Sequence, residues 1–154
     1  GLLDRSIDGV NMVNAPFIAK ERGVEVQESR SNEVHEYTST VQVQVTTQNR
    51  THRVTGSIFG KGDSRIVQFD EYKLEAVLSK NMLVLNNIDV PGVIGNLGNV
   101  LGKHNLNIAD FHLGRMEVGG KAVAIINIDS PPSTEALGEL RNTANIINVN
   151  SVTL

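Results

Sequence analysis

The sequence predicts an α+β protein: an antiparallel sheet with a packed helix, followed by a domain of alternating strands and helices. The core material is aliphatic, because 40% of the 154 residues are hydrophobic but only 4% are aromatic. Such residues favour sheets covered by small helices. Residues 39–47 alternate apolar and polar side chains at period two, which indicates a strand. After residue 81 the pattern switches repeatedly between strand and helix periodicity.

The charge distribution divides the chain into two predicted domains, residues 1–80 and 81–154. The first part carries 10 Lys or Arg and 11 Asp or Glu, whereas the second carries 4 and 6 and is more apolar. A shift of this kind is typical of a domain boundary.

The first domain is predicted to begin with a short strand at residues 10–13 and a helix that follows it. Asn14 is a suitable helix cap, Pro16 fits the first turn, and Gly23 ends the helix. Strands are then expected at residues 39–47, 51–59, 64–69 and 72–77. These elements predict an antiparallel sheet with one helix packed on it.

The second domain is predicted to be ferredoxin-like. A strand at 82–85 precedes a helix at 92–103, whose apolar residues recur at helical spacing. Strands at 107–113 and 121–128 flank a turn at 118–120, and a helix at 133–141 leads to a last strand at 146–152. The order βαββαβ is the ferredoxin-like arrangement.

Composition excludes several classes of function. The net charge of −3 shows no basic excess for nucleic acid. The lack of cysteine excludes disulfides, thiolate catalysis and cysteine-ligated metals, and fits a reducing compartment. No apolar run approaches the ~20 residues of a membrane span, and the first residues do not resemble a signal peptide. We therefore expect a cytoplasmic protein, and the start without Met suggests a piece of a longer chain.

No catalytic residue and no metal site are predicted. The histidines, at His35, His52, His104 and His112, are scattered and have no partner at metal-ligand spacing. No nucleophile and base, and no carboxylate pair, stand at a defined spacing.

The stretch 87–95 is the most informative one for function. Pro91 and Gly92 predict a turn into a helix whose first N–H groups attract a carboxylate or phosphate. Asp89 supplies a negative charge beside this position, which suits an ammonium group. Asn107, after the helix, offers an amide to the same ligand. A carboxylate beside an anion site is how a free amino acid is recognised.

Two other interpretations of these residues stay open. In the first, Asp89 only caps the helix, the Pro-Gly pair only makes a turn, and Asn107 is a loop residue. In the second, the glycines at 92, 95 and 98 form a dinucleotide loop. Their spacing lacks the Gly-x-Gly turn of that motif, and no suitable acidic residue follows.

The residues resemble known families. Residues 89–95 (Asp-x-Pro-Gly-Val-x-Gly), 101–102 (Leu-Gly) and 107–109 (Asn-Ile-Ala) are similar to the ACT-domain pattern of amino-acid sensors over residues 82–154. Residues 10–16, 19–23, 56–62 and 65–67 resemble the C-terminal region of long-form D-3-phosphoglycerate dehydrogenases. In that family an allosteric substrate-binding domain precedes the ACT domain.

The resemblance implies two binding sites. L-serine is expected at an ACT homodimer interface, bound by Asn87, Asp89, the amides around Val93 and Ile94, and Asn107 of the facing subunit. Phosphate or a phosphorylated substrate is expected in the upstream domain, with Lys61 and Arg65 as the matching basic residues.

The resemblance also implies a parent enzyme that uses NAD⁺, while these residues would hold no cofactor and turn nothing over. It would oxidise 3-phospho-D-glycerate to 3-phosphooxypyruvate, the first step of L-serine biosynthesis, and serine would inhibit it by feedback. Two alternatives remain: an assembly module that keeps the ACT fold without a ligand, and the regulatory region of an iron–sulfur L-serine dehydratase.

Overall fold

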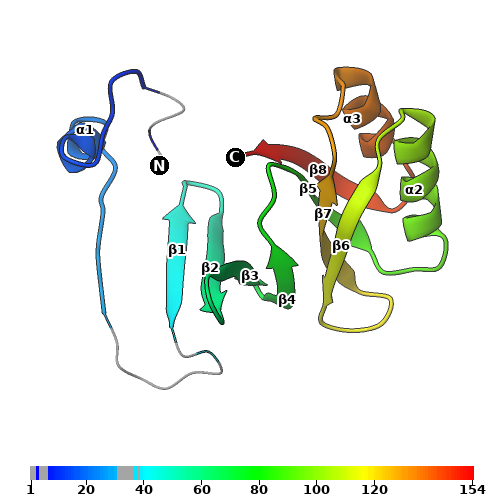
Figure 1. The fold of residues 1–154 in the computed structure, drawn as a ribbon, viewed down its shortest axis with the longest axis horizontal. Coiled ribbons are helices and arrows are strands. Elements are labelled where there is room, and N and C mark those ends of the chain that lie inside the picture. The colour runs from blue at the N-terminus through cyan, green and yellow to red at the C-terminus, as the bar shows by residue number, and fades with distance from the viewer. Residues whose placement is uncertain (1–2, 4–6, 31–36, 38) are drawn as a thin grey trace. The chain divides into compact units, whose positions relative to one another are not determined.

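The computed structural model describes residues 3, 7–30, 37 and 39–154. The chain divides into two compact units, residues 1–35 and 36–154. The first unit contains a helix, and the second contains both sheets and the remaining helices (Figure 1). The predicted boundary near residue 80 therefore falls inside the second unit, between its two sheets, and stays a prediction.

The helix of the first unit, α1 (Ala15–Glu21), begins with proline in its first turn and ends before Gly23, as predicted. The strand predicted at residues 10–13 is wrong. The Asn11 side chain accepts the N–H groups of Val13 and Asn14, which folds these residues into a turn. Asn14 occupies the cap position, but its side chain bonds back to the turn instead of capping the helix. The predicted packing of α1 on the first sheet stays a prediction.

The first sheet is an antiparallel meander in the order β1-β2-β3-β4. Its strands are β1 (Thr40–Thr46), β2 (Thr51–Phe59), β3 (Asp63–Phe69) and β4 (Tyr72–Val77), which confirms the four predicted strands. Every residue of β1 is exposed, whereas β4 buries alternate side chains. Burial therefore increases across the sheet from β1 to β4.

The second sheet has the order β6-β7-β5-β8 with antiparallel neighbours, and this is the ferredoxin-like topology. Its strands and helices follow the order β5 (Asn81–Ile88), α2 (Val93–Lys103), β6 (Ile108–Arg115), β7 (Lys121–Ile128), α3 (Thr134–Arg141) and β8 (Ile146–Thr153). The predicted α+β class and βαββαβ order are confirmed. Ser133 caps α3 by accepting the N–H of Ala136.

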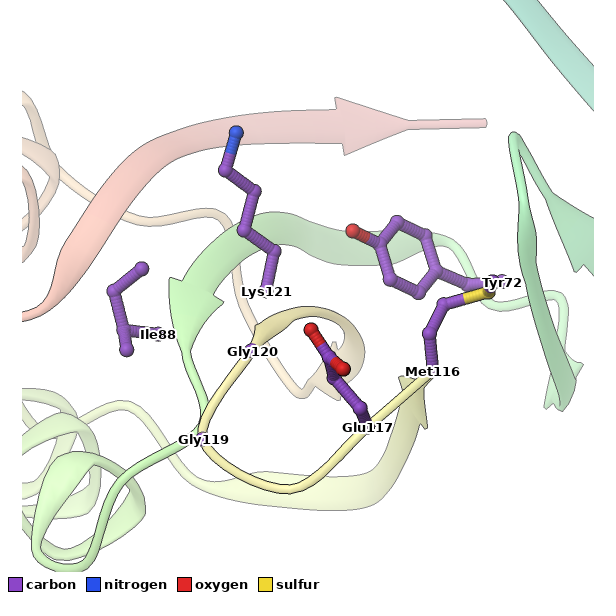
Figure 2. A pocket seen from close by; sticks show the side chains of 7 residues that line it. All are labelled: Tyr72, Ile88, Met116, Glu117, Gly119, Gly120 and Lys121. Carbon is purple, nitrogen blue, oxygen red and sulfur yellow. The ribbon is translucent and has the colours of Figure 1, made fainter.

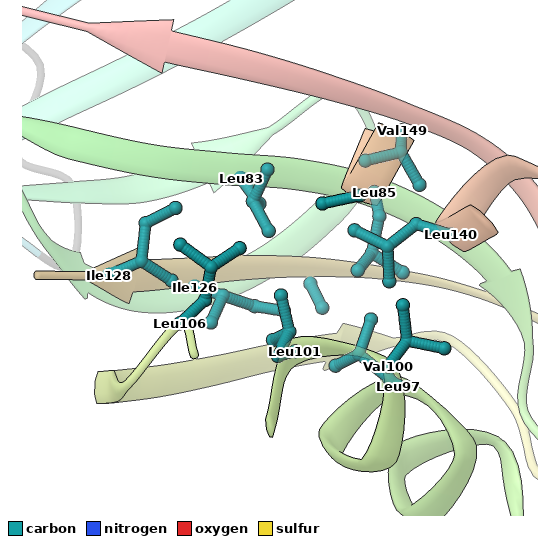
Figure 3. Packing of buried hydrophobic residues seen from close by; sticks show 12 residues of the cluster. Leu83, Leu85, Leu97, Val100, Leu101, Leu106, Ile126, Ile128, Leu140 and Val149 are labelled. Atoms are coloured by element: carbon teal, nitrogen blue, oxygen red, sulfur yellow. The ribbon is translucent and has the colours of Figure 1, made fainter. Parts of the chain in front are cut away.

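The main core lies between this sheet and its two helices (Figure 3). Leucines of β5 and α2 and isoleucines of β7 fill it, among them the fully buried Leu83, Leu101 and Ile126. The packing of α2 on this face holds the preceding loop at the carboxyl end of β5.

The other face of the second sheet packs against β4. Tyr72, Leu74 and Ala76 of β4 form a second core with Met82, Val123 and Ile125. At Gly114, strands β6 and β4 approach so closely that a Cβ atom added to this glycine would lie 3.0 Å from the Lys73 carbonyl oxygen. The two sheets of this unit are therefore in direct contact. Within the described residues, no helix has the length and apolar character required to cross a membrane.

Candidate ligand site at the start of α2

The loop between β5 and α2 presents free backbone N–H groups. Gly92 stands at the cap position with φ of +91°, a left-handed conformation that favours glycine, and no side chain caps the helix. The first N–H groups of a helix have no partner within it, and here they include those of Ile94 and Gly95. The Val93 N–H contacts the Val90 carbonyl oxygen at 3.5 Å.

Asp89 does not cap the helix, so the interpretation that gave it this role alone is wrong. Its Oδ2 accepts a hydrogen bond from Arg115 Nη1 at 2.8 Å, and its side chain is 17% exposed. Its backbone N–H donates to the Gly120 carbonyl oxygen at 2.8 Å. These two bonds hold the carboxylate against the end of β6 and the hairpin that follows it.

Arg115 was not predicted as a member of this site. It ends β6, which runs parallel to β5 with β7 between them. The carboxyl ends of both strands therefore lie at the same edge of the sheet. The parallel direction of β5 and β6 also follows from the predicted ferredoxin-like topology.

Asn87 and Asn107 lie at opposite ends of the domain. Asn87 is 4% exposed at the end of β5, and its Nδ2 donates to the Ile88 carbonyl oxygen at 2.9 Å. Asn107 is exposed beyond the other end of α2, where its Nδ2 donates to Asp129 Oδ2 at 2.8 Å. The 11 residues of α2 span about 16 Å. Asn87, Asp89 and the first turn of α2 therefore follow one another at one end of the domain, and Asn107 lies at the other.

A pocket of about 380 Å³ lies beneath the turn that joins β6 to β7. Figure 2 shows its lining, which comes from the hairpin, the end of β5 and Tyr72 of β4, and consists of Tyr72, Ile88, Met116, Glu117, Gly119, Gly120 and Lys121. Burial, together with the charge of the neighbouring Glu71, raises the pKa of Tyr72. The bond from the Asp89 N–H to the Gly120 carbonyl oxygen makes the Asp89 loop and this hairpin neighbours. The pocket is lined by the hairpin and by Tyr72 of the first sheet.

The predicted anion-binding residues lie at the β2–β3 turn of the first sheet. Lys61 is exposed between two glycines with positive φ. Arg65 donates to Asp63 at 2.6 Å and to Glu75 at 3.3 Å, and its guanidinium lies 5.0 Å from the centre of the Phe59 ring. The hydrogen bond and charge of Asp63 raise the pKa of Arg65. Two carboxylates thus compete with any anion for this arginine.

The histidines that the structure describes pair with single carboxylates. His52 bonds to Asp70 and His104 to Glu139, both at 2.9 Å. The Nε2 atom of His112 lies 2.9 Å from a carboxylate oxygen of Asp110 without hydrogen-bond alignment. Across residues 7–30 and 39–154, no three His, Asp or Glu residues come together as metal ligands. His35 lies outside the described residues.

The ferredoxin-like sheet, its two helices and the open loop before α2 are consistent with an ACT domain. Residues 82–145 match the family described as "ACT domain", and residues 1–70 match "D-3-phosphoglycerate dehydrogenase intervening domain". The chain therefore carries a domain similar to the D-3-phosphoglycerate dehydrogenase intervening domain, followed by an ACT domain.

Individual relatives are of two kinds. The chain is 34% identical to D-3-phosphoglycerate dehydrogenase from Synechocystis and 32% identical to that from Bacillus subtilis, in both cases over 100% of its own length. It spans 28% and 30% of those relatives. It is also 27% identical to the probable L-serine dehydratase beta chain of Bacillus subtilis, over 99% of the chain and 69% of that relative.

Proposed function

We propose that this chain is the amino-acid-sensing region of a D-3-phosphoglycerate dehydrogenase and that its ligand is L-serine. Two features of one loop carry the proposal: the Asp89 carboxylate stands four residues before α2, and no side chain caps the first N–H groups of that helix. This places a negative charge beside a positive helix end. A zwitterionic amino acid carries the two complementary charges.

Each part of serine has a matching group in the proposed site. The carboxylate accepts hydrogen bonds from the first-turn amides around Val93 and Ile94, where the helix dipole favours an anion. The ammonium group binds the Asp89 carboxylate in a charge-assisted hydrogen bond. The hydroxyl group bonds to an asparagine amide, from Asn87 or Asn107.

The proposed site is completed by a second copy of the chain. Asn107 and Asp89 are separated by the length of α2, so Asn107 reaches a serine bound at Asp89 from a facing subunit. A two-fold axis creates two such sites, since each copy contributes both ends of its helix. The strands β6 and β8 are the edges of the second sheet, and pairing through an edge is one way to bring two such sheets together.

In the proposed parent enzyme, a catalytic part beyond these residues oxidises 3-phospho-D-glycerate with NAD⁺ in the cytoplasm. Serine, as the end product, inhibits it by feedback. Binding changes activity to the extent that serine has different affinities for two arrangements of the subunits. Phosphate or a phosphorylated substrate at Lys61 and Arg65 is a second proposed ligand, which must first displace Asp63 or Glu75 from the arginine.

A second candidate is the regulatory region of an L-serine dehydratase. The similarity to the probable L-serine dehydratase beta chain, which extends over nearly the whole chain, favours it. Both candidates use the same serine site, so they differ in the activity that is regulated and not in the ligand. Expression of the gene's full product and assay of both activities separates them.

The test of the serine site is isothermal titration at a concentration where sedimentation shows a dimer. We expect saturable binding of L-serine at about one per chain, and much weaker binding of D-serine and glycine. Asp89→Asn keeps the size of the side chain and removes its charge, so binding should be lost. Asp8→Asn, at an exposed position of the first unit, is the matched control. A flat titration of the folded dimer would instead support an assembly module without a ligand.

A further inference from the structure

We propose that Arg115 is an internal cation which occupies the ammonium position in the ligand-free ACT domain, and that a bound amino acid displaces it. This inference rests on the proposed function, because Asp89 is the ammonium partner there. It adds a residue to the site, and a way for the site to report that it is filled.

The contact that supports it is the ion pair itself. Arg115 Nη1 lies 2.8 Å from Asp89 Oδ2, a distance typical of a charge-assisted hydrogen bond. A ligand ammonium group needs the same carboxylate. The guanidinium and the ammonium group therefore compete for one partner, and ligand binding is an exchange of cations.

The exposure of the two side chains determines which of them moves. Arg115 is 53% exposed, whereas Asp89 is 17% exposed, and the Asp89 backbone is held by its bond to Gly120. A long, half-exposed side chain can swing into water with little loss of solvation. The carboxylate stays in place, so the exchange requires no rearrangement of the loop.

Displacement of Arg115 also changes what holds the hairpin between β6 and β7. Two bonds connect the Asp89 loop to this hairpin, one from the Arg115 side chain and one from the Asp89 N–H to Gly120. The hairpin turn and Tyr72 of β4 line the same open pocket. When one of the two bonds is broken, the turn beside this pocket is held less firmly.

The resulting sequence of contacts leads from the ligand to the first sheet. Ammonium binding releases Arg115, release of Arg115 loosens the turn, and the turn lines one pocket with Tyr72. This gives the serine site a physical connection to the neighbouring domain within one chain. The pair is a two-state element, because Arg115 is either bound to Asp89 or free in solvent.

The test compares the wild-type chain with Arg115→Gln, at dimer concentration, by titration with L-serine. Removing the competitor should tighten serine binding about two- to five-fold, the range expected from partly exposed ion pairs. Arg53→Gln is the matched control, since Arg53 is an exposed arginine that bonds to Gln44 on the first sheet. We expect no change in serine affinity for the control.

Hydrogen exchange gives a second, independent readout at the hairpin amides 116–120. Serine should speed their exchange in the wild-type chain. In Arg115→Gln their exchange should be fast without serine and unchanged by it. A variant that merely damaged the fold would bind serine more weakly.

Each outcome decides the inference. Equal or weaker serine binding by Arg115→Gln, with a wild-type chain that binds, overturns the role of Arg115 and leaves the serine site intact. Absence of binding in both chains overturns the serine site and the inference together. Serine binding by Arg115→Gln that is tighter than binding by the wild-type chain supports both.

Discussion

Gly114 lies where β6 meets β4, and its replacement by alanine should weaken the contact between the two sheets. A Cβ atom there would lie 3.0 Å from the Lys73 carbonyl oxygen, 3.1 Å from Tyr72 Cβ and 3.4 Å from Val123 Cγ1. Two of these neighbours belong to backbone or to an atom fixed to it, so they cannot rotate away. Either β4 shifts outward or the new methyl group remains compressed.

The expected magnitude follows from two opposing effects. Overpacking of a well-packed contact costs about 1–3 kcal/mol. Alanine also has less conformational freedom than glycine in the unfolded chain, which stabilises the folded state by about 0.4–1 kcal/mol. We therefore expect Gly114→Ala to lower the free energy of unfolding by about 1 kcal/mol, because the two sheets must separate slightly.

Urea unfolding of the chain measures this difference, and Gly138→Ala is the matched control. Gly138 lies inside α3, and apart from its chain neighbours and the backbone of its own helix no atom lies within 4 Å of its added Cβ. Alanine there should therefore stabilise the chain by about 1 kcal/mol. The same chemical change is thus expected to have opposite signs at the two positions. A Gly114→Ala chain as stable as the wild type would refute the close contact between β4 and β6.

Three further predictions concern the core, the pH dependence and the anion site. Leu101→Ala, at a fully buried position, should lower the free energy of unfolding by about 2–5 kcal/mol in urea; a smaller loss would mean that the core collapses around the cavity. Hydrogen bonds from Lys103 and His104 lower the pKa of Glu139 below 4.5, so this group contributes stability above pH 4.5 that is lost as the pH falls through the lowered value. The urea midpoint of Glu139→Gln should therefore fall less on acidification than that of the wild type, and a parallel fall would contradict the assignment. Lys61→Ala combined with Arg65→Ala should weaken phosphate binding and leave serine binding unchanged in titration; equal loss of both ligands would indicate a damaged fold.

Most of the secondary structure could be predicted because the signals are local. The period-two run at residues 39–47 and the helical spacing in residues 92–103 depend on neighbouring residues alone. The wrong strand at 10–13 also came from a local signal. Its apolar residues favour a strand, but two asparagine side chains bond to the backbone and form a turn.

The candidate site could be predicted only in part. Asp89, Gly92 and the start of α2 lie within a few residues of one another, so the sequence reveals them together. The Arg115 ion pair joins residues 26 positions apart and depends on the order of strands in the sheet. The pocket beneath the hairpin depends in addition on β4 of the first sheet, which the second domain's sequence does not contain.

The position of β5 in the second sheet has a consequence for folding. Although β5 is the first strand of that sheet in the chain, it lies inside the sheet, between β7 and β8. Asn81 pairs with Thr153, so one edge of β5 is satisfied only after a long loop closes. The β1–β4 meander, by contrast, pairs consecutive strands and closes short loops. During synthesis the meander can form first, while the leucines of β5 stay open to aggregation until β8 has emerged.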